Sequence, residues 1–318
     1  MSIVNQTGGG EFLKYFSNLK LFWGLSRTPH GLLDVATPAM AAMLQLGQFP
    51  PVSTIAIGLI AAFSGYTAVY AMNDLVDVNT DKERLALKRK SDVVFHVDEV
   101  LAEHPVAQGL IPFKKGLAWV IFWTSLALIG AAALNPLCAG IFAISACCEL
   151  VYCKLLKVTH WKIVPSAIVK ATGGLAGIYA VNPAPNPSFV VFVFLWLACW
   201  EIGGQNIAND IVDMEDDDRV GARTMLTVLG LRKSLFILVA AASMATFAGV
   251  TIFLFAGPGL GRIYPAGAML LGYFLLLKPA HLVCESPGPR MAAALFNRAS
   301  YMPLSFLVLI VMSIWIKI

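Results

Sequence analysis

Charged residues are scarce in this chain of 318 residues. Asp, Glu, Lys and Arg together make up 13% of it, against roughly 25% in an average soluble domain, which excludes an ordinary soluble enzyme. Disorder is excluded too, because disordered chains combine low hydrophobicity with high charge density, whereas 58% of these residues are hydrophobic. The formal net charge of +4 is too small to indicate a nucleic acid partner.

The chain also lacks cysteine pairs at metal-binding or redox spacing. Its six cysteines form no CxxC or CxxCH motif, so neither a structural zinc site nor a disulfide framework is indicated. The first 20 residues are polar and mixed, without the apolar core of a cleavable signal peptide. We therefore expect the N-terminus to stay on the chain.

Long apolar runs are what the sequence has instead. A run of about 20 apolar residues can cross a hydrocarbon core about 30 Å thick. These runs predict an all-α polytopic membrane protein, a single domain over residues 1–318 in which nine transmembrane helices form a bundle around an apolar chamber. The expected spans are 31–49, 52–72, 116–134, 137–156, 164–182, 188–208, 234–256, 262–278 and 299–316.

The basic residues support this count and give an orientation. With the N-terminus inside, 20 of the 23 Lys and Arg residues fall in inner segments, as the positive-inside rule requires. The outer connections are short and rich in Pro and Asn, so we expect function on the inner, cytoplasmic face. The inner segments of interest are the N-terminal segment 1–30 and two expected active-site loops, 73–115 and 209–233.

Two acidic segments repeat one pattern. Residues 73–81 read NDLVDVNTD and residues 209–217 read NDIVDMEDD, so Asn, Asp, Val, Asp and Asp recur at the same offsets. On a helix, carboxylates at i, i+3 and i+7 form a single stripe. Two such stripes on one membrane face repel unless cations compensate them, and Mg²⁺ commonly bridges carboxylates to a substrate phosphate. The pattern predicts a cage for metal-bound diphosphate with the ligands Asp74, Asp77, Asp81, Asp210, Asp213 and Asp217.

Two other interpretations apply to these acidic segments. They could be solvated helix ends, but the duplication of the pattern disfavours that. Asp77, Asn79 and Asp81 also match the start of a calcium-binding loop. That pattern fails at its sixth and twelfth positions, where Lys82 and Lys88 stand in place of Gly and Glu.

With these motifs the sequence resembles the UbiA superfamily of intramembrane prenyltransferases, whose hallmark is a pair of NDxxDxxxD-like motifs after the second and sixth of nine helices. The segment His104-Pro105-Val106-Ala107-Gln108-Gly109 is similar to the family's RPxxxG, with His104 in place of Arg. Tyr152, followed by Lys154 and Lys157, is similar to its Tyr/Lys motif, and either lysine fits. Gly221-Ala222-Arg223-Thr224 is similar to its GxxT segment.

The resemblance implies a Mg²⁺-dependent enzyme that transfers a polyprenyl group from its diphosphate to a hydrophobic or aromatic acceptor, expected to be an aromatic quinone precursor. It implies an integral protein of a bacterial or archaeal inner membrane. A membrane terpene cyclase and an ion-coupled transporter stay open as alternatives, although a transporter would place its carboxylates near the bilayer midplane. Candidate contacts to the diphosphate are Asn73, Asn209, Tyr152, Lys154, Lys157 and Arg223.

Four ionisable residues fall inside the expected spans or at their ends. A charge at the bilayer centre costs about 2.5–3.5 kcal/mol, so these groups should face the protein interior. They could bind the acceptor's polar head or take its proton, or they could pair with one another. We expect pairing for Glu149 and acceptor contacts for Lys170 and Asp34, while Glu201 stays open. The charged stretch 82–104 could form a lid or a solvated connection.

Overall fold

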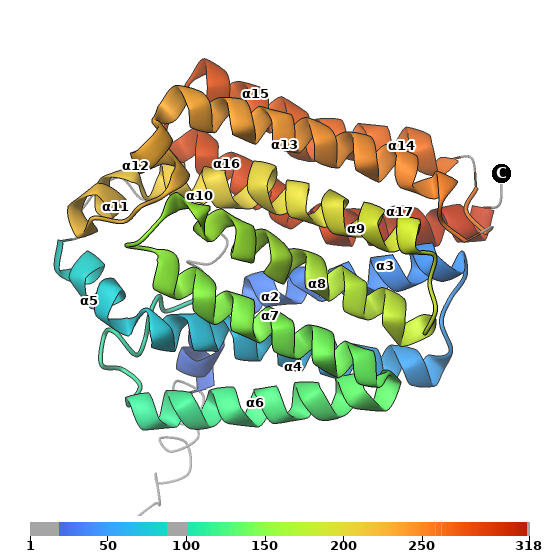
Figure 1. Cartoon of the computed structure of the whole chain (residues 1–318), viewed down its shortest axis with the longest axis horizontal. Coiled ribbons are helices and arrows are strands. Elements are labelled where there is room, and N and C mark those ends of the chain that lie inside the picture. Colours follow the sequence, from blue (N-terminus) through green and yellow to red (C-terminus); the bar gives the residue numbers. More distant parts are fainter. Residues whose placement is uncertain (1–18, 88–100, 258, 262, 317–318) are drawn as a thin grey trace, which may run out of the picture.

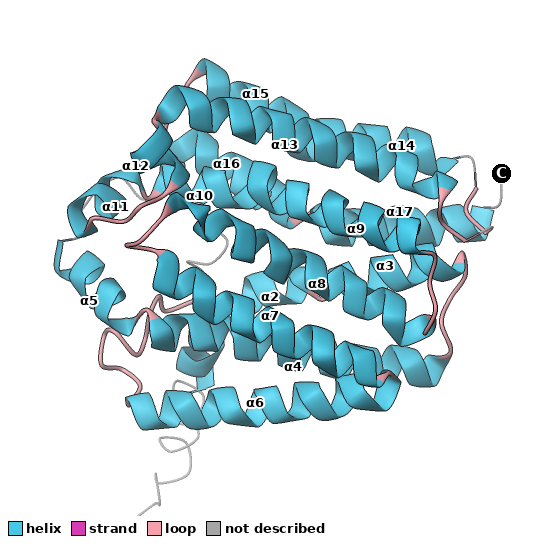
Figure 2. Cartoon of the chain, viewed as in Figure 1, coloured by secondary structure: helices cyan, strands magenta, loops and turns pink. Residues whose placement is uncertain are grey.

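The computed structural model describes residues 19–87, 101–257, 259–261 and 263–316, which form helices joined by short turns, with no strand among them (Figure 2). Eight helices within these ranges are long and apolar enough to cross a membrane. They correspond to the second to ninth expected spans. Their bounds are Val52–Val76, Phe113–Leu134, Pro136–Leu155, His160–Val181, Pro187–Val212, Leu231–Leu254, Ile263–Glu285 and Pro289–Ile316.

The first expected span, 31–49, is divided in two. Helix α2 (Thr28–Asp34) and helix α3 (Ala36–Leu46) are separated at Val35. Pro38 has no backbone N–H to donate to the carbonyl of Asp34 four residues earlier, so the hydrogen-bond ladder is interrupted at this place. Neither helix alone has the length of a span. The first expected span, and with it the total of nine, therefore stays a prediction.

Several long helices are composed of shorter helical elements. Two of them begin where the sequence provides caps, because the side chains of Asn135 and Asn186 accept hydrogen bonds from the first turn and a proline follows each cap. The elements are α4 (Val52–Val76), α6 (Phe113–Leu134), α7 (Pro136–Leu155), α8 (Ile163–Val181), α9 (Pro187–Trp200), α10 (Ile207–Val212), α13 (Leu231–Thr251), α14 (Ile263–Gly272), α15 (Lys278–Glu285), α16 (Pro289–Ser300) and α17 (Met302–Ile316).

The expected inner connection 278–298 is largely helical, and this part of the sequence prediction is wrong. Helices α15 and α16 occupy it and leave only residues 286–288 between them. Their buried residues recur every three or four positions, as in Ala292, Leu295 and Ala299, while polar side chains cover the other face. The polar face lowered the apolar content of this stretch, so the spans were expected to be shorter than they are.

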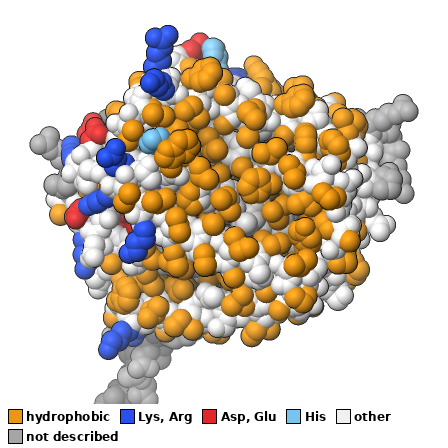
Figure 3. Space-filling view, viewed as in Figure 1, with side chains coloured by type: hydrophobic (Ala, Val, Ile, Leu, Met, Phe, Trp, Pro, Cys, Tyr) orange, Lys and Arg blue, Asp and Glu red, His pale blue; other side chains and the backbone are white. Residues whose placement is uncertain are grey.

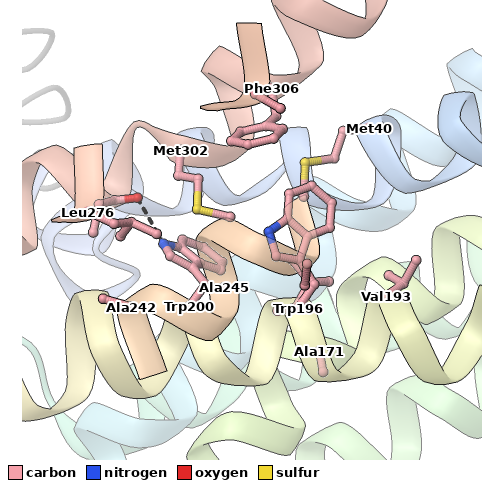
Figure 4. Packing of buried hydrophobic residues seen from close by; sticks show 14 of the residues in the cluster. Met40, Ala171, Val193, Trp196, Trp200, Ala242, Ala245, Leu276, Met302 and Phe306 are labelled. Carbon is pink, nitrogen blue, oxygen red and sulfur yellow. Dashed lines mark hydrogen bonds between the residues drawn. The ribbon is translucent and has the colours of Figure 1, made fainter. Parts of the chain in front are cut away.

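The largest group of buried apolar residues lies between the second half of the chain and α3. Trp196, Trp200, Met302 and Phe306 pack together there, and the indole N–H of Trp200 donates to the carbonyl of Ala299 at 3.0 Å (Figure 4). Many large apolar side chains lie on the outside instead, where a bilayer would cover them. This pattern of exposure is that of an integral membrane protein.

Charged side chains gather at one end of the molecule, whereas hydrophobic ones cover the rest of the visible face (Figure 3). The helices at that end are short: α5 (Val78–Leu87), α11 (Met214–Val220) and α12 (Met225–Leu229) (Figure 1). They occupy the parts of 73–115 and 209–233 that were expected to be loops. Residues 1–18 of the expected inner segment 1–30, and residues 88–100 of the stretch 82–104, lie outside the described residues.

Candidate active site

The two acidic motifs have the same local structure. In each, a long helix ends at the middle aspartate and a short helix follows, so the expected single helix is interrupted at Asp77 and Asp213. The backbone angles φ and ψ are −89° and 5° at Asp77 and −91° and 8° at Asp213. The backbone N–H groups of these residues donate to Asn73 and Asn209 at 3.0 and 2.9 Å. The sequence repeat is therefore also a repeat of backbone conformation.

The two motifs face each other across one cavity of about 260 Å³. Arg84, on the short helix of the first motif, connects them directly, because its Nη2 lies 2.5 Å from Oδ1 of Asp217 in the second. Helix α5 thereby lies against α11. The cavity lining includes Asn73, Asn209, Tyr152, Lys170, Asp34 and all six aspartates, Asp74, Asp77, Asp81, Asp210, Asp213 and Asp217.

His104 lies between two carboxylates of the first motif. Its Nδ1 is 2.7 Å from Asp74 and 2.9 Å from Asp81, and the ligand atoms of these three residues lie within 4.8 Å of one another, close enough to hold a metal ion. Although burial disfavours the imidazolium, hydrogen bonds to Asp74 and Asp81 outweigh it and raise the pKa of His104 to about 9. His104 thus supplies a positive charge at the position of the family's Arg.

Carboxylate crowding at this end favours a cation. Burial and the nearby charge of Asp81 raise the pKa of Asp77. Burial also raises the pKa of Asp217 to about 6, although Arg84 opposes this change. Oδ2 of Asp74 is buried and has no hydrogen-bond partner among the described residues. Crowded carboxylates with an unpaired buried oxygen are the hard donor set that suits Mg²⁺.

Three expected phosphate contacts lie away from the cavity. Lys154 and Arg223 are exposed, and exposed Lys157 pairs with Glu83 at 2.5 Å. Lys162, which the sequence analysis did not single out, lines the cavity in their place. Only 4% of Lys162 is exposed, and its Nζ lies 3.3 Å from Asp210 and 5.0 Å from the ring centroid of Tyr152.

A signal in the sequence could have identified Lys162. Lys162, Ser166 and Lys170 are spaced four residues apart, which places them on one face of a helix. All three line the cavity, because the turn His160–Lys162, capped by the side chain of Thr159, brings Lys162 into line with α8. The Tyr/Lys motif indicates only Lys154 and Lys157, so it does not identify this helix face.

Ionisable residues in the deeper part of the cavity pair with neighbours. The Lys170 ammonium lies 2.6 Å from Asp34, whose same oxygen accepts from the Tyr70 hydroxyl at 2.5 Å. The side-chain amide of Asn73 donates to Glu149 at 2.6 Å, whereas the expected partner was another of the four ionisable residues.

A π-helical segment, Glu201–Asn206, joins α9 to α10 and contributes three polar side chains to the same cavity. Gly203 lets this segment approach α13 closely, since a Cβ there would lie 2.4 Å from the backbone nitrogen of Ala242. The Ser166 hydroxyl donates to Glu201 at 2.6 Å and accepts from Asn206 at 3.1 Å. Short π-helical segments of this kind often occur at functional sites.

An apolar cavity of about 400 Å³ adjoins the polar one. Tyr66, Val69 and Val169 line both cavities, so they mark the boundary between them. The apolar cavity is otherwise lined mainly by side chains of α3, α4, α7 and α8. A charged head group and an apolar tail of one ligand could therefore be held side by side.

The fold and this site define a class: a helical membrane protein with paired acidic motifs beside an apolar chamber. The family model of the UbiA prenyltransferase family matches residues 35–307, and the chain belongs to this family. The resemblance noted in the sequence is thereby confirmed.

Individual relatives are distant in sequence. The digeranylgeranylglyceryl phosphate synthase of Thermococcus sibiricus is 24% identical over 274 residues, which cover 86% of this chain and 90% of the relative. An apo UbiA homolog from Aeropyrum pernix superposes with a TM-score of 0.68 at 18% identity over 89% of this chain and 97% of that chain. A UbiA homolog from Archaeoglobus fulgidus bound to GPP and Mg²⁺ gives 0.67 at 16% identity over 93% and 99%.

Proposed function

We propose that this protein transfers a prenyl group from a prenyl diphosphate to an acceptor within the membrane. The observation that carries the proposal is the convergence of both acidic motifs on one cavity that adjoins an apolar chamber. A solvated pair of helix ends would not need such an arrangement. The related protein from Archaeoglobus fulgidus, with its bound GPP and Mg²⁺, supports the same chemistry.

The metal in this proposal is Mg²⁺, held by Asp74, Asp77, Asp81, Asp210, Asp213 and Asp217. When bound, Mg²⁺ stabilises the negative charge that develops on a leaving diphosphate. Asn209 donates to Asp213 at 3.0 Å and so orients that carboxylate. Asn73 and Tyr152, which also line the cavity, keep the proposed contacts to the diphosphate.

Two cations that line the cavity would bind the diphosphate oxygens. Lys162 and Arg84 carry this role, since an ammonium and a guanidinium each make charge-assisted hydrogen bonds to phosphate. The sequence also predicted Lys154, Lys157 and Arg223 as contacts; because they do not line the cavity, we propose Lys162 and Arg84 in their place. The apolar chamber would hold the prenyl tail and exclude water, which would otherwise quench the allylic cation.

The proposal also concerns the chemical class of the acceptor. An aromatic quinone precursor is the acceptor expected from the sequence, with Lys170 and Asp34 near its polar head. The relative from Thermococcus sibiricus is a synthase of a phosphorylated glyceryl lipid, which makes such a lipid a second candidate. We further propose an inner-membrane location with the N-terminus and both acidic motifs on the cytoplasmic side.

The experiment is an assay of purified protein with Mg²⁺, prenyl diphosphates of several lengths, and a panel containing aromatic acids, a naphthoate and a glyceryl phosphate lipid. We expect a product whose mass equals acceptor plus prenyl group, together with released pyrophosphate. A cyclised hydrocarbon or terpenol from the diphosphate alone would favour a terpene cyclase instead. Ion flux in proteoliposomes without any diphosphate turnover would contradict both enzymes.

A further inference from the structure

Glu201 is a buried carboxylate that metal binding and diphosphate binding leave unused. It is the first residue of the π-helical segment and lines the polar cavity with 5% of its surface exposed. Ser166 donates to Oε1 at 2.6 Å. Oε2 is buried and has no hydrogen-bond partner among the described residues. An unpaired buried carboxylate oxygen is costly, so a ligand that donates a hydrogen bond would stabilise it.

Two neighbouring residues share this shortage of donors. Oδ1 of Asp34 and Oδ1 of Asn206 are also buried without a hydrogen-bond partner within the described part of the chain, and both residues line the same cavity. Asn206 is linked to Glu201 through Ser166, and Asp34 is linked to the same α8 face through Lys170. The part of the cavity around Glu201 thus offers three unused acceptor oxygens on neighbouring residues. A complementary ligand would bring donors to them.

The unpaired acceptor oxygens disfavour an anionic group directly beside Glu201. The Lys170 ammonium is already paired with Asp34 at 2.6 Å, so its charge is largely neutralised. A carboxylate or phosphate placed against Oε2 of Glu201 would add further acceptor oxygens beside an oxygen that has no donor among the described residues. A hydroxyl group is different, because it donates one hydrogen bond and keeps lone pairs for reaction.

Glu201 lies along the cavity between the diphosphate end and the apolar chamber. Its partner Ser166 lies one helical turn, about 6 Å, from Lys162 on one side and from Lys170 on the other. Lys162 marks the diphosphate end, through its contact with Asp210. Lys170 lies deeper, beside the boundary with the apolar chamber. Glu201 therefore lies next to the place where the carbon attached to the diphosphate would be.

We propose that the acceptor is an alcohol or phenol that enters hydroxyl first, and that Glu201 takes the proton of this hydroxyl as its oxygen is prenylated. This inference rests on the proposed prenyl transfer and specifies its acceptor. The bond between the allylic carbon and the diphosphate oxygen breaks, and its electron pair leaves with the diphosphate. The acceptor oxygen forms a new bond to that carbon, and its proton moves to Oε2 of Glu201. The products are an ether and pyrophosphate, and Glu201 then returns the proton to water.

The first test is Glu201→Gln, which keeps the size of the side chain and an oxygen that can accept from Ser166. General-base catalysis contributes about 10²- to 10⁴-fold, so we expect kcat for ether formation to fall at least about 100-fold. The KM for prenyl diphosphate and the slow release of pyrophosphate without acceptor should change less than about threefold. Glu215→Gln is the matched control, because Glu215 is exposed, does not line the cavity and pairs with Arg219 at 3.3 Å.

The second test uses the wild-type protein and needs no variant to fold. A glyceryl phosphate lipid and a phenol are each compared with their O-methyl ethers, and the linkage in the product is determined by NMR. We expect an ether from each hydroxyl compound and no transfer to the methyl ethers.

Three outcomes would overturn the inference while prenyl transfer itself stands: equal turnover of the methyl ethers, a carbon–carbon linked product, or unchanged ether formation in Glu201→Gln. If the wild-type protein releases no pyrophosphate from any prenyl diphosphate, the proposed function fails first, and the two failures are distinguishable.

Discussion

Lys162 lies buried between the second acidic motif and Tyr152, and its effect on turnover can be separated from that of the two exposed lysines before it. Loss of a charge-assisted hydrogen bond costs about 1.5–3 kcal/mol, which is roughly a 10- to 150-fold loss at 1.4 kcal/mol per tenfold. We expect Lys162→Gln to lower kcat/KM for prenyl diphosphate by this factor. Lys154→Gln and Lys157→Gln are the matched controls and should change it less than about threefold. A larger loss in either control would place the functional cation back in the Tyr/Lys motif.

The raised pKa of His104 makes stability depend on pH. Because this pKa is about 9 in the folded protein, above its usual value of 6.5, the contacts to Asp74 and Asp81 stabilise fully below about pH 6.5 and are lost as pH rises through about 9. Thermal unfolding in detergent with a chelator should therefore show wild type more stable than His104→Gln at pH 6, with the difference in Tm vanishing near pH 10. A difference in Tm that stays constant between pH 6 and pH 10 would contradict the assignment of a positive charge to His104.

Some residues of the candidate site were predictable from the sequence and others were not. The difference is whether a sequence motif marks the residue or only helix packing brings it to the cavity. The six aspartates were predicted because the repeat marks them without any knowledge of packing. Lys162 and Arg84 were not, since their approach to Asp210 and Asp217 depends on helices that are distant in sequence. Lys157 was predicted from spacing, but it follows the end of α7, its side chain does not line the cavity, and Glu83 pairs with it.

Among the elements, the pairing of α5 with α11 is what brings the two acidic motifs together. Arg84 on α5 forms an ion pair with Asp217 on α11, and the Arg84 side chain is 24% exposed whereas that of Asp217 is 3% exposed. Arg84→Gln leaves a buried carboxylate without its charged partner, so we expect a loss of about 1.5–3 kcal/mol in the free energy of unfolding. Unfolding of purified protein by denaturant in mixed micelles measures it.

The matched control is on the same helix α5. Glu83→Gln breaks the exposed pair with Lys157, and exposed pairs contribute only about 0–1 kcal/mol. If Glu83→Gln lowers the free energy of unfolding as much as Arg84→Gln does, burial of the Arg84–Asp217 pair is not what holds α5 against α11.

Helix positions were predictable where the apolar run alone decides them. The run 52–72 predicted α4 because no charged residue interrupts it, and a bilayer would cover its exposed side. The break at Asp77 was not predictable from the stripe of carboxylates, because i, i+3 and i+7 spacing also fits one unbroken helix. The division of the first span at Val35 follows from Pro38, a signal that was present in the sequence and not used.

For the molecule as a whole, the predicted orientation places the charged end in the cytoplasm. Helix α15, which carries the exposed free thiol of Cys284, lies at the same end as α11 and α12 (Figure 1). A membrane-impermeant maleimide should therefore label inverted membrane vesicles and spare intact cells. Cys284→Ser should remove the labelling. Labelling in intact cells that is lost in Cys284→Ser would reverse the orientation.

The central claim is that both acidic motifs act together to release pyrophosphate from a prenyl diphosphate. The most direct measurement is Mg²⁺-dependent release of pyrophosphate from geranylgeranyl diphosphate by Asp74→Asn, Asp210→Asn and the control Asp216→Asn. Asp216 lies in the second motif but pairs at the surface with Arg219. We predict at least a roughly 100-fold loss from each of the two cavity variants, of the size seen when charge stabilisation is removed from an active site, and wild-type rates for Asp216→Asn. Full activity in Asp74→Asn and Asp210→Asn would contradict the account.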